Sequence, residues 1–219
     1  MKHKIATACL AALISTALPA ACPMHPDAPP ELSANHDCCR IAQEKWEATL
    51  AARAPSAHSL YQVESAWQNQ DGDTAPLSQL AGRHQLVAMA YTTCEYACPR
   101  LLADLKAIET QLADLRPAEL GITLITFDPA RDTAARFREY AQTNGLDLRR
   151  WTLLRADPGD TLELANLLGV RYKPMPNGEI THSNIITLLS PRGEIVAQID
   201  GLGADAEPLL EKLGAQKKP

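Results

Sequence analysis

The sequence predicts a three-layer α/β domain in which helices cover both faces of a central mixed sheet. Three observations indicate this class. Short apolar runs alternate with amphipathic stretches from residue 60 onward. Two of these runs, at 85–91 and 121–126, are typical of buried strands. A pair of apolar segments joined by a turn follows them. Alternating strands and helices favour parallel pairing, and a late hairpin adds antiparallel strands. The 219 residues suffice for one such domain plus additional sequence.

The first half of the domain is predicted to hold two strands and a helix. Residues 60–67 resemble a strand that ends at a turn around residues 71–72, and residues 85–91 are typical of a buried strand. Residues 99–112 follow as a helix, and Pro99 fits its first turn because an N–H is not needed there. The apolar residues with helical spacing are Leu101, Leu102, Leu105, Ile108 and Leu112.

The second half continues the alternation and then adds a hairpin. Residues 121–126 are typical of another buried strand, and Asp132 with Thr133 can cap a helix that runs to about residue 143. The remaining predicted elements are a strand at 151–155, a helix at 161–168, hairpin strands at 184–189 and 194–199 around the turn 190–193, and a helix at 204–213.

Residues 1–21 resemble a secretory signal peptide. Lys2 and Lys4 precede an uncharged, alanine-rich run, which stops short of the roughly 20 strongly apolar residues that a spanning helix needs. We expect cleavage near residue 20 or 21, and a protein in the periplasm or on the outer face of the cytoplasmic membrane. A cut directly before Cys22 would also suit lipoprotein processing, and a lipid on Cys22 would hold the protein at a membrane.

Residues 22–57 are predicted to form a flexible tail or linker ahead of the domain, which we place at residues 58–214. The tail gathers soft sulfur donors and imidazoles, which are reasonable ligands for Cu(I). These candidate accessory metal ligands are Cys22, Met24, His25, His36, Cys38 and Cys39. The alternative is a plain tether, with Cys38 and Cys39 paired to other thiols because adjacent cysteines bridge each other only with strain.

The charge balance argues against one class of partner. Asp and Glu number 26 against 21 Lys and Arg, which gives a formal net charge of -5. A nucleic-acid-binding domain normally carries a basic stripe that neutralises phosphates. We therefore expect no nucleic-acid partner.

Two cysteines mark the predicted junction between a buried strand and a helix. Cys94 lies in the connecting loop and Cys98 at the helix start, where the positive end of the helix dipole favours a thiolate and lowers a thiol pKa from about 8.5. Crevices at the carboxyl ends of strands in such sheets hold active sites. The four-residue step lets the sulfurs approach, so the pair could form a disulfide or clamp a soft ion. A merely stabilising bridge is the alternative.

Together with His182, these cysteines give the sequence a resemblance to the Sco/SenC family of copper-handling proteins, which have a thioredoxin-like fold. His182 lies 84 residues after Cys98. The similarity covers about residues 60–213, and thioredoxins carry Cys-x-x-Cys instead. The segments that carry it are Asp71-Gly72, residues 77–82, Thr93-Cys94-x-x-x-Cys98-Pro99, residues 127–133, residues 169–173 and His182-Ser183.

The resemblance implies a copper site in which Cys94 and Cys98 are thiolate ligands and His182 is an imidazole ligand. Two soft sulfurs and one nitrogen suit Cu(I), and the same set can hold Cu(II) in tetragonal surroundings. Zinc would also accept these donors, so the choice of copper comes from the resemblance. The implied partner is a copper acceptor protein, such as a subunit of a respiratory oxidase.

The sequence departs from the family pattern at two places near the implied ligands. Thr181 stands where the family commonly has Asp before the histidine, and Glu95-Tyr96 stand where it often has Pro-Asp. Asp128 is the nearest acidic position of the family pattern that remains. The alternative role of Asp128 is in a turn or a helix cap.

Two functions remain open on these residues. The leading interpretation is a copper chaperone, not primarily a catalyst, that receives copper and passes it on by ligand exchange. The alternative is a thiol-disulfide reductase that uses Cys94 and Cys98 as a redox pair. His182 distinguishes the two, because holding a metal needs a third donor whereas dithiol exchange does not.

Overall fold

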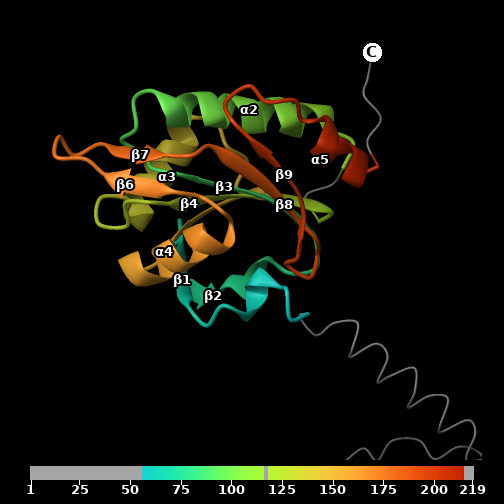
Figure 1. Cartoon of the computed structure of the whole chain (residues 1–219), viewed down its shortest axis with the longest axis horizontal. Coiled ribbons are helices and arrows are strands. Elements are labelled where there is room, and N and C mark those ends of the chain that lie inside the picture. Colours follow the sequence, from blue (N-terminus) through green and yellow to red (C-terminus); the bar gives the residue numbers. More distant parts are fainter. Residues whose placement is uncertain (1–55, 116–117, 215–219) are drawn as a thin grey trace, which may run out of the picture. The chain divides into compact units, whose positions relative to one another are not determined.

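The computed structural model describes residues 56–115 and 118–214 (Figure 1). The predicted signal peptide of residues 1–21 and the six candidate metal ligands of the tail lie outside the described residues. In the described part of the chain, no helix combines the length and apolarity needed to span a bilayer.

A seven-stranded mixed sheet forms the centre of the domain, in the strand order β2-β1-β5-β4-β3-β8-β9. β4 pairs in parallel with both β3 and β5, and the other neighbours are antiparallel. The predicted mixed sheet and its late hairpin are confirmed. The strands are β1 (Ala66–Asn69), β2 (Thr74–Pro76), β3 (His84–Ala90), β4 (Leu120–Thr126), β5 (Trp151–Arg155), β8 (Ile185–Leu189) and β9 (Ile195–Asp200).

Helices cover both faces of this sheet, as predicted. In Figure 1, α2 lies above the sheet and α4 lies below it. The α-helices are α2 (Ala97–Gln111), α3 (Ala134–Thr143), α4 (Pro158–Leu167) and α5 (Glu207–Lys212), and the short 3-10 helices are η2 (Leu60–Gln62) and η3 (Leu77–Leu80).

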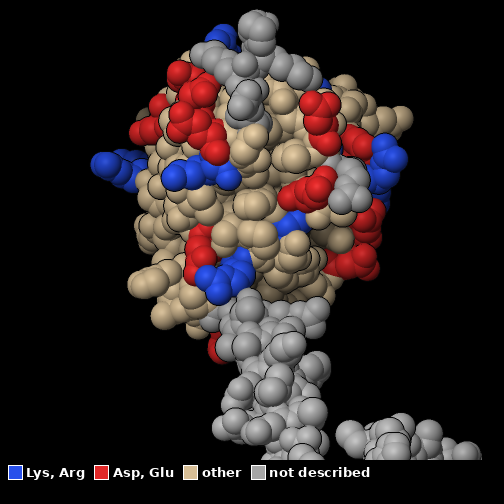
Figure 2. Space-filling view, turned by 90° about the vertical axis from the view of Figure 1, so that its right-hand side faces the viewer, with Lys and Arg blue, Asp and Glu red and all other residues tan. Residues whose placement is uncertain are grey.

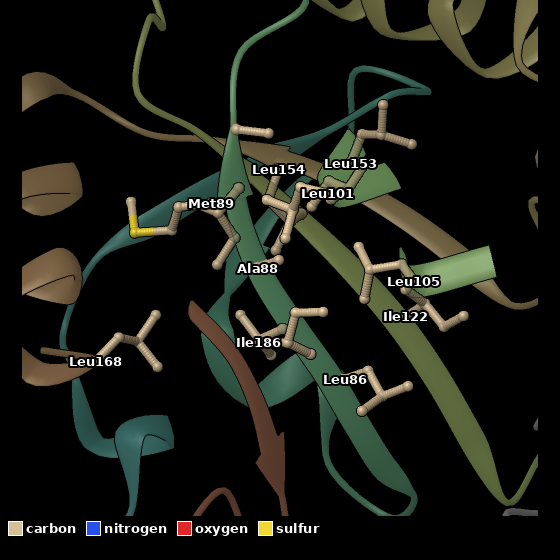
Figure 3. Packing of buried hydrophobic residues seen from close by; sticks show 14 of the residues in the cluster. Leu86, Ala88, Met89, Leu101, Leu105, Ile122, Leu153, Leu154, Leu168 and Ile186 are labelled. Atoms are coloured by element: carbon tan, nitrogen blue, oxygen red, sulfur yellow. The ribbon is translucent and has the colours of Figure 1, made fainter. Parts of the chain in front are cut away.

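The two central parallel strands are buried because helices cover both of their faces. Every residue of β4 is buried, and so is every residue of β3 after His84. Figure 3 shows Leu101 and Leu105 of α2 on one side of β3, with Met89 and Leu168 on the other. This packing fixes the carboxyl end of β3, from which the cysteine-bearing loop begins.

The first predicted strand, residues 60–67, is wrong up to residue 65. Leu60–Gln62 forms η2, and β1 begins only at Ala66. The Ser59 hydroxyl accepts a hydrogen bond from the Tyr61 N–H at 3.1 Å and so caps this turn. Leu60 and Tyr61 are both buried, whereas consecutive residues of a strand point to opposite faces.

A second, two-stranded sheet lies outside the predicted pattern. β6 (Tyr172–Pro174) pairs antiparallel with β7 (Ile180–His182). Ile180 is the one buried residue in these two strands, so the sequence shows no alternating apolar pattern there. His182 is therefore the last residue of a hairpin strand.

Three helices differ from prediction in where they begin. α2 begins at Ala97 rather than at residue 99. α4 begins at Pro158 rather than near residue 161, because the Asp157 carboxylate accepts hydrogen bonds from the N–H groups of Gly159 at 2.8 Å and Asp160 at 3.0 Å. α5 is shorter than expected and begins at Glu207.

Charged side chains of both signs share the face shown in Figure 2. On this face, Lys and Arg side chains lie scattered among Asp and Glu side chains. The expectation that nucleic acid is not a partner stays a prediction.

Asp132 anchors the segment that leads into the cysteine loop. Thr133 is the N-cap of α3, and its hydroxyl accepts from the Arg136 N–H at 3.3 Å. Asp132 instead is 0% exposed, and its carboxylate accepts from the Thr92 N–H at 3.1 Å and from the hydroxyls of Thr92 and Thr126. The carboxylate thereby ties the end of β4 to the chain just before Cys94.

Replacing Asp132 by Ala should lower the free energy of unfolding by about 2–4 kcal/mol, because three donors of buried Thr126 and half-buried Thr92 lose their acceptor. Chemical denaturation followed by tryptophan fluorescence measures the change. The exposed residue Asp73 gives a matched control, and Asp73→Ala should change stability by less than about 0.5 kcal/mol. Equal losses in the two variants would show that the buried carboxylate does not anchor this segment.

Candidate metal centre

Three elements bring Cys94, Cys98 and His182 together at one edge of the domain. Cys94 lies in the loop after β3, Cys98 is the second residue of α2, and His182 is the last residue of β7. Their candidate ligand atoms all lie within 4.8 Å of one another. Among the described residues, this is the one cluster of at least three His, Cys, Asp or Glu side chains with metal-binding spacing.

The separations suit a single ion. The Cys98 sulfur lies 3.6 Å from His182 Nε2, and both cysteines are free thiols. Bonds of about 2.0–2.3 Å from a metal to three surrounding donors place those donors roughly 3.5–4 Å apart. Small side-chain adjustments are therefore enough to seat an ion between the two sulfurs and the imidazole.

His182 is held with its ligand nitrogen directed at the thiols. Nδ1 lies 3.1 Å from the Ser183 carbonyl oxygen, which can only accept a hydrogen bond. The proton therefore resides on Nδ1, and the lone pair of Nε2 faces the Cys98 sulfur. Burial lowers the pKa of His182, and the bond to Ser183 only partly offsets this effect. The imidazole is thus neutral near pH 7, as a metal ligand must be.

Aromatic rings pack around the imidazole. The Phe127 ring lies 4.9 Å from the His182 ring between centroids, and the Tyr91 ring meets it edge to face at 6.1 Å. Phe127 also packs against Tyr172 at 4.8 Å. These contacts limit the rotation of the imidazole and account for its partial burial.

The start of α2 stabilises the Cys94 sulfur rather than that of Cys98. The Cys98 N–H points at Cys94 Sγ at 3.3 Å. Burial by itself raises the pKa of Cys94, but hydrogen bonds from the Cys98 and Tyr96 backbone and from the Cys98 and Tyr91 side chains outweigh it and lower the pKa. Cys94 is therefore the thiol that ionises more readily.

The prediction that Cys98 has a lowered pKa is wrong. Cys98 is 2% exposed, and this burial raises its pKa. Negative charge on Cys94 and on Asp132 adds to the increase. Cys98 belongs to the buried core, and the N–H group at this helix start that donates to a sulfur contacts Cys94 instead.

A cavity of about 490 Å³ opens beside the site. Cys94 and His182 line it together with Tyr91 and Arg131, whereas Cys98 does not. Tyr96 also lines the cavity and is 78% exposed. Two of the three candidate ligands therefore face the opening, and the third lies behind them.

The departures from the family pattern are at the surface. Glu95 and Tyr96 are exposed. Thr181 is exposed as well, and its hydroxyl donates to the Lys173 carbonyl across the β6–β7 hairpin at 3.3 Å. Thr181 thus supports the hairpin but places no charge beside the imidazole.

Asp128 has the alternative role named in the sequence analysis, because it stabilises a turn. Its carboxylate accepts from the Arg131 guanidinium, and its carbonyl accepts from the Asp132 N–H at 2.9 Å. Arg131 Nη2 also donates to the Gly178 carbonyl at 2.9 Å. This turn is therefore linked to the tip of the β6–β7 hairpin.

Sequence reasoning missed three residues that surround the candidate ligands: Tyr91, Phe127 and Arg131. A signal for two of them was available. Tyr91 directly follows β3 and Phe127 directly follows β4, and these strands are parallel neighbours. The carboxyl ends of parallel neighbours meet at one edge of a sheet, so their aromatic side chains can flank a common site.

An α/β domain with a Cys-x-x-x-Cys pair where a central strand leads into a helix, and a histidine beside that pair, is a thioredoxin-like thiol protein. The family model described as SCO1/SenC matches residues 55–217. The chain therefore belongs to the SCO1/SenC family, and the resemblance of its motifs is confirmed.

Known relatives agree with this assignment. The chain is 25% identical over 148 residues to the SCO1 protein homolog of Bacillus subtilis, covering 65% of this chain and 75% of the relative. A solved Arabidopsis thaliana ScoI with copper bound has a TM-score of 0.60 at 20% identity, with 69% of this chain and 94% of that chain covered.

A second solved structure with a similar fold is that of BsSco, described as a member of the Sco family of cytochrome c oxidase assembly proteins with a disulfide switch. Its structure has a TM-score of 0.60 at 23% identity, covering 70% of this chain and 92% of that chain. The two solved structures share the fold of this chain, which confirms the predicted thioredoxin-like class.

In the reduced protein, Cys94 should be alkylated at least tenfold faster than Cys98 at neutral pH. The thiolate is the reactive form, and Cys94 combines a lowered pKa with access to the cavity. Cys94 should keep reacting as the pH falls below the range of an ordinary thiol, whereas Cys98 should react only as the pH rises above it. Peptide mapping after iodoacetamide treatment gives both rates, and faster labelling of Cys98 would contradict the geometry.

Proposed function

We propose that this protein binds copper through Cys94, Cys98 and His182 and passes the ion to an acceptor protein. The observation that carries the proposal is the convergence of two free thiols and a neutral imidazole within 4.8 Å. Soft sulfur and imidazole donors suit Cu(I), and Cu(II) can use the same set. Zinc would accept these donors too, and the copper bound by the Arabidopsis relative supports copper instead.

The unequal exposure of the donors supports an order of ligand exchange. A donor group of the acceptor enters through the cavity, on the side of Cys94 and His182. It replaces one of these ligands while Cys98 holds the ion from the buried side. When the acceptor has supplied its remaining donors, the ion leaves with its oxidation state unchanged, and Cys94 keeps its hydrogen bond from the Cys98 N–H.

We place this transfer in the cell envelope, with an oxidase subunit as the acceptor. The signal-like pattern of residues 1–21 supports export, and the description of BsSco as an oxidase assembly protein supports the acceptor. A lipid on Cys22 would keep the protein close to a membrane-bound acceptor. The tail donors would then bind further copper.

A second candidate function is thiol-disulfide exchange. The observation that favours it is the pairing of an accessible thiol of lowered pKa, Cys94, with a buried neighbour, Cys98. The Cys94 thiolate would attack a partner disulfide, and Cys98 would then attack Cys94 and release the partner as a dithiol. The two electrons come from this pair, which ends as a disulfide.

The reduced full-length chain should bind one more tight equivalent of Cu(I) than its Cys94→Ser or Cys98→Ser variant. Loss of a direct ligand should cost more than the roughly 10- to 100-fold that loss of an outer-shell partner costs. Competition with a chromophoric Cu(I) chelator measures both stoichiometry and affinity. The variant for the third ligand is His182→Ala, and its control is His58→Ala because His58 is exposed. His58→Ala should bind copper like wild type. Unchanged binding in both serine variants would refute the site.

Copper transfer and disulfide reduction should respond differently to His182→Ala. The rate of copper transfer to a reduced dithiol acceptor should change, because the imidazole is a ligand of the ion. The rate of disulfide reduction should not change, because the sulfur-sulfur chemistry does not need this residue. The measurements are absorbance of the copper-loaded acceptor and turnover of a generic disulfide with a reductant supplied. Fast disulfide turnover, together with transfer that His182→Ala leaves unaltered, would favour the reductase over the chaperone.

A further inference from the structure

The hairpin that carries His182 leads into β8 of the main sheet, and side chains from other elements also hold it. β6 and β7 pair with each other, and neither belongs to the seven-stranded sheet. Near the hairpin tip, Arg131 Nη2 donates to the Gly178 carbonyl at 2.9 Å. Farther along, the Tyr91 hydroxyl accepts from the Ile180 N–H at 3.2 Å. The position of the imidazole therefore depends on such contacts.

Tyr91 contacts both kinds of candidate ligand. It is 6% exposed, and its carbonyl accepts a hydrogen bond from the Cys94 N–H at 3.3 Å. Its side chain also helps to lower the pKa of the Cys94 thiol. Its ring meets the His182 ring at an interplanar angle of 81°. One side chain thus joins a thiol of the loop to the strand that presents the imidazole.

We propose that Tyr91 is a positioning residue that sets the imidazole of His182 against the two sulfurs, through the hydrogen bond between its hydroxyl and the Ile180 N–H. Ile180 and His182 lie two residues apart on β7, so their side chains point to the same face of the strand. Without the hydroxyl, the hairpin loses an anchor beside its ligand, while the contact between the rings remains. The inference rests on the proposed copper binding and adds a residue that is not itself a ligand.

Tyr91→Phe is the appropriate variant because it removes the hydroxyl and keeps the ring. Tyr61→Phe is its matched control. Tyr61 is also buried, and within the described residues its hydroxyl has no hydrogen-bond partner. The two variants therefore remove the same atom from a buried tyrosine, and thermal unfolding of both shows whether the fold is retained.

Copper competition tests the role of Tyr91 through a double-mutant cycle with His182→Ala. Tyr91→Phe should weaken copper binding about three- to tenfold in the wild-type background, the effect expected for one hydrogen bond. In the His182→Ala background it should change binding less than about twofold, because no imidazole remains to be positioned. Pulsed EPR of the Cu(II) form should show weaker or more heterogeneous imidazole nitrogen coupling in Tyr91→Phe.

An equal loss in both backgrounds would mean that Tyr91 acts only on the Cys94 sulfur, and it would overturn the inference. An unchanged affinity in the wild-type background would do the same. Tyr61→Phe should leave copper binding unaltered.

Amide hydrogen exchange gives a readout that needs no metal. Exchange at Ile180 should be at least tenfold faster in Tyr91→Phe than in wild type, and unchanged in Tyr61→Phe. If the chain bound no copper but Ile180 exchanged faster, the proposed function would fail while the positioning contact stood. Unchanged exchange at Ile180 would overturn the inference whatever the copper measurements gave.

Discussion

A single backbone N–H at the start of α2 donates to the Cys94 sulfur at 3.3 Å, and the organisation of the two thiols follows from it. The first N–H groups of a helix have no partner within the helix, so they are available to a side chain of the preceding loop. Here that side chain is a thiol. Cys94 is thereby kept at the cavity, while Cys98, on the helix itself, points into the core. This hydrogen bond helps to lower the pKa of Cys94, whereas burial raises the pKa of Cys98.

The candidate site joins a rigid part to a separately supported part. Both cysteines lie where a buried central strand leads into a helix, and Asp132 fixes the chain just before them. His182 instead lies on a hairpin outside the main sheet, supported by Tyr91, Arg131 and the packing of Phe127. Tyr91 links the two parts, because it contacts both the Cys94 loop and the hairpin.

The central strands were predictable because burial on both faces leaves a mostly apolar run, as at residues 121–126, and the bounds of Trp151–Arg155 agree with prediction. The β6–β7 hairpin was not predictable from the sequence. Ile180 is the one buried residue in its two strands, so contacts with the rest of the fold form these strands rather than a local apolar pattern.

Motif similarity identified Cys94, Cys98 and His182, but the pKa of Cys98 was misjudged. The dipole argument assumes a sulfur in front of the helix end, and the depth of a side chain cannot be read from a local pattern.

The depth of Cys98 also determines how the protein withstands peroxide. An oxidant that reaches the cavity meets Cys94 first and converts its thiolate to a sulfenic acid. The Cys98 thiol lies beneath it and can condense with that sulfenic acid, releasing water and leaving a disulfide. A disulfide is reducible, whereas the sulfinic acid formed by a second oxidation is in general not. Burying one thiol behind the other therefore limits oxidative injury to a form that a cellular reductant can repair.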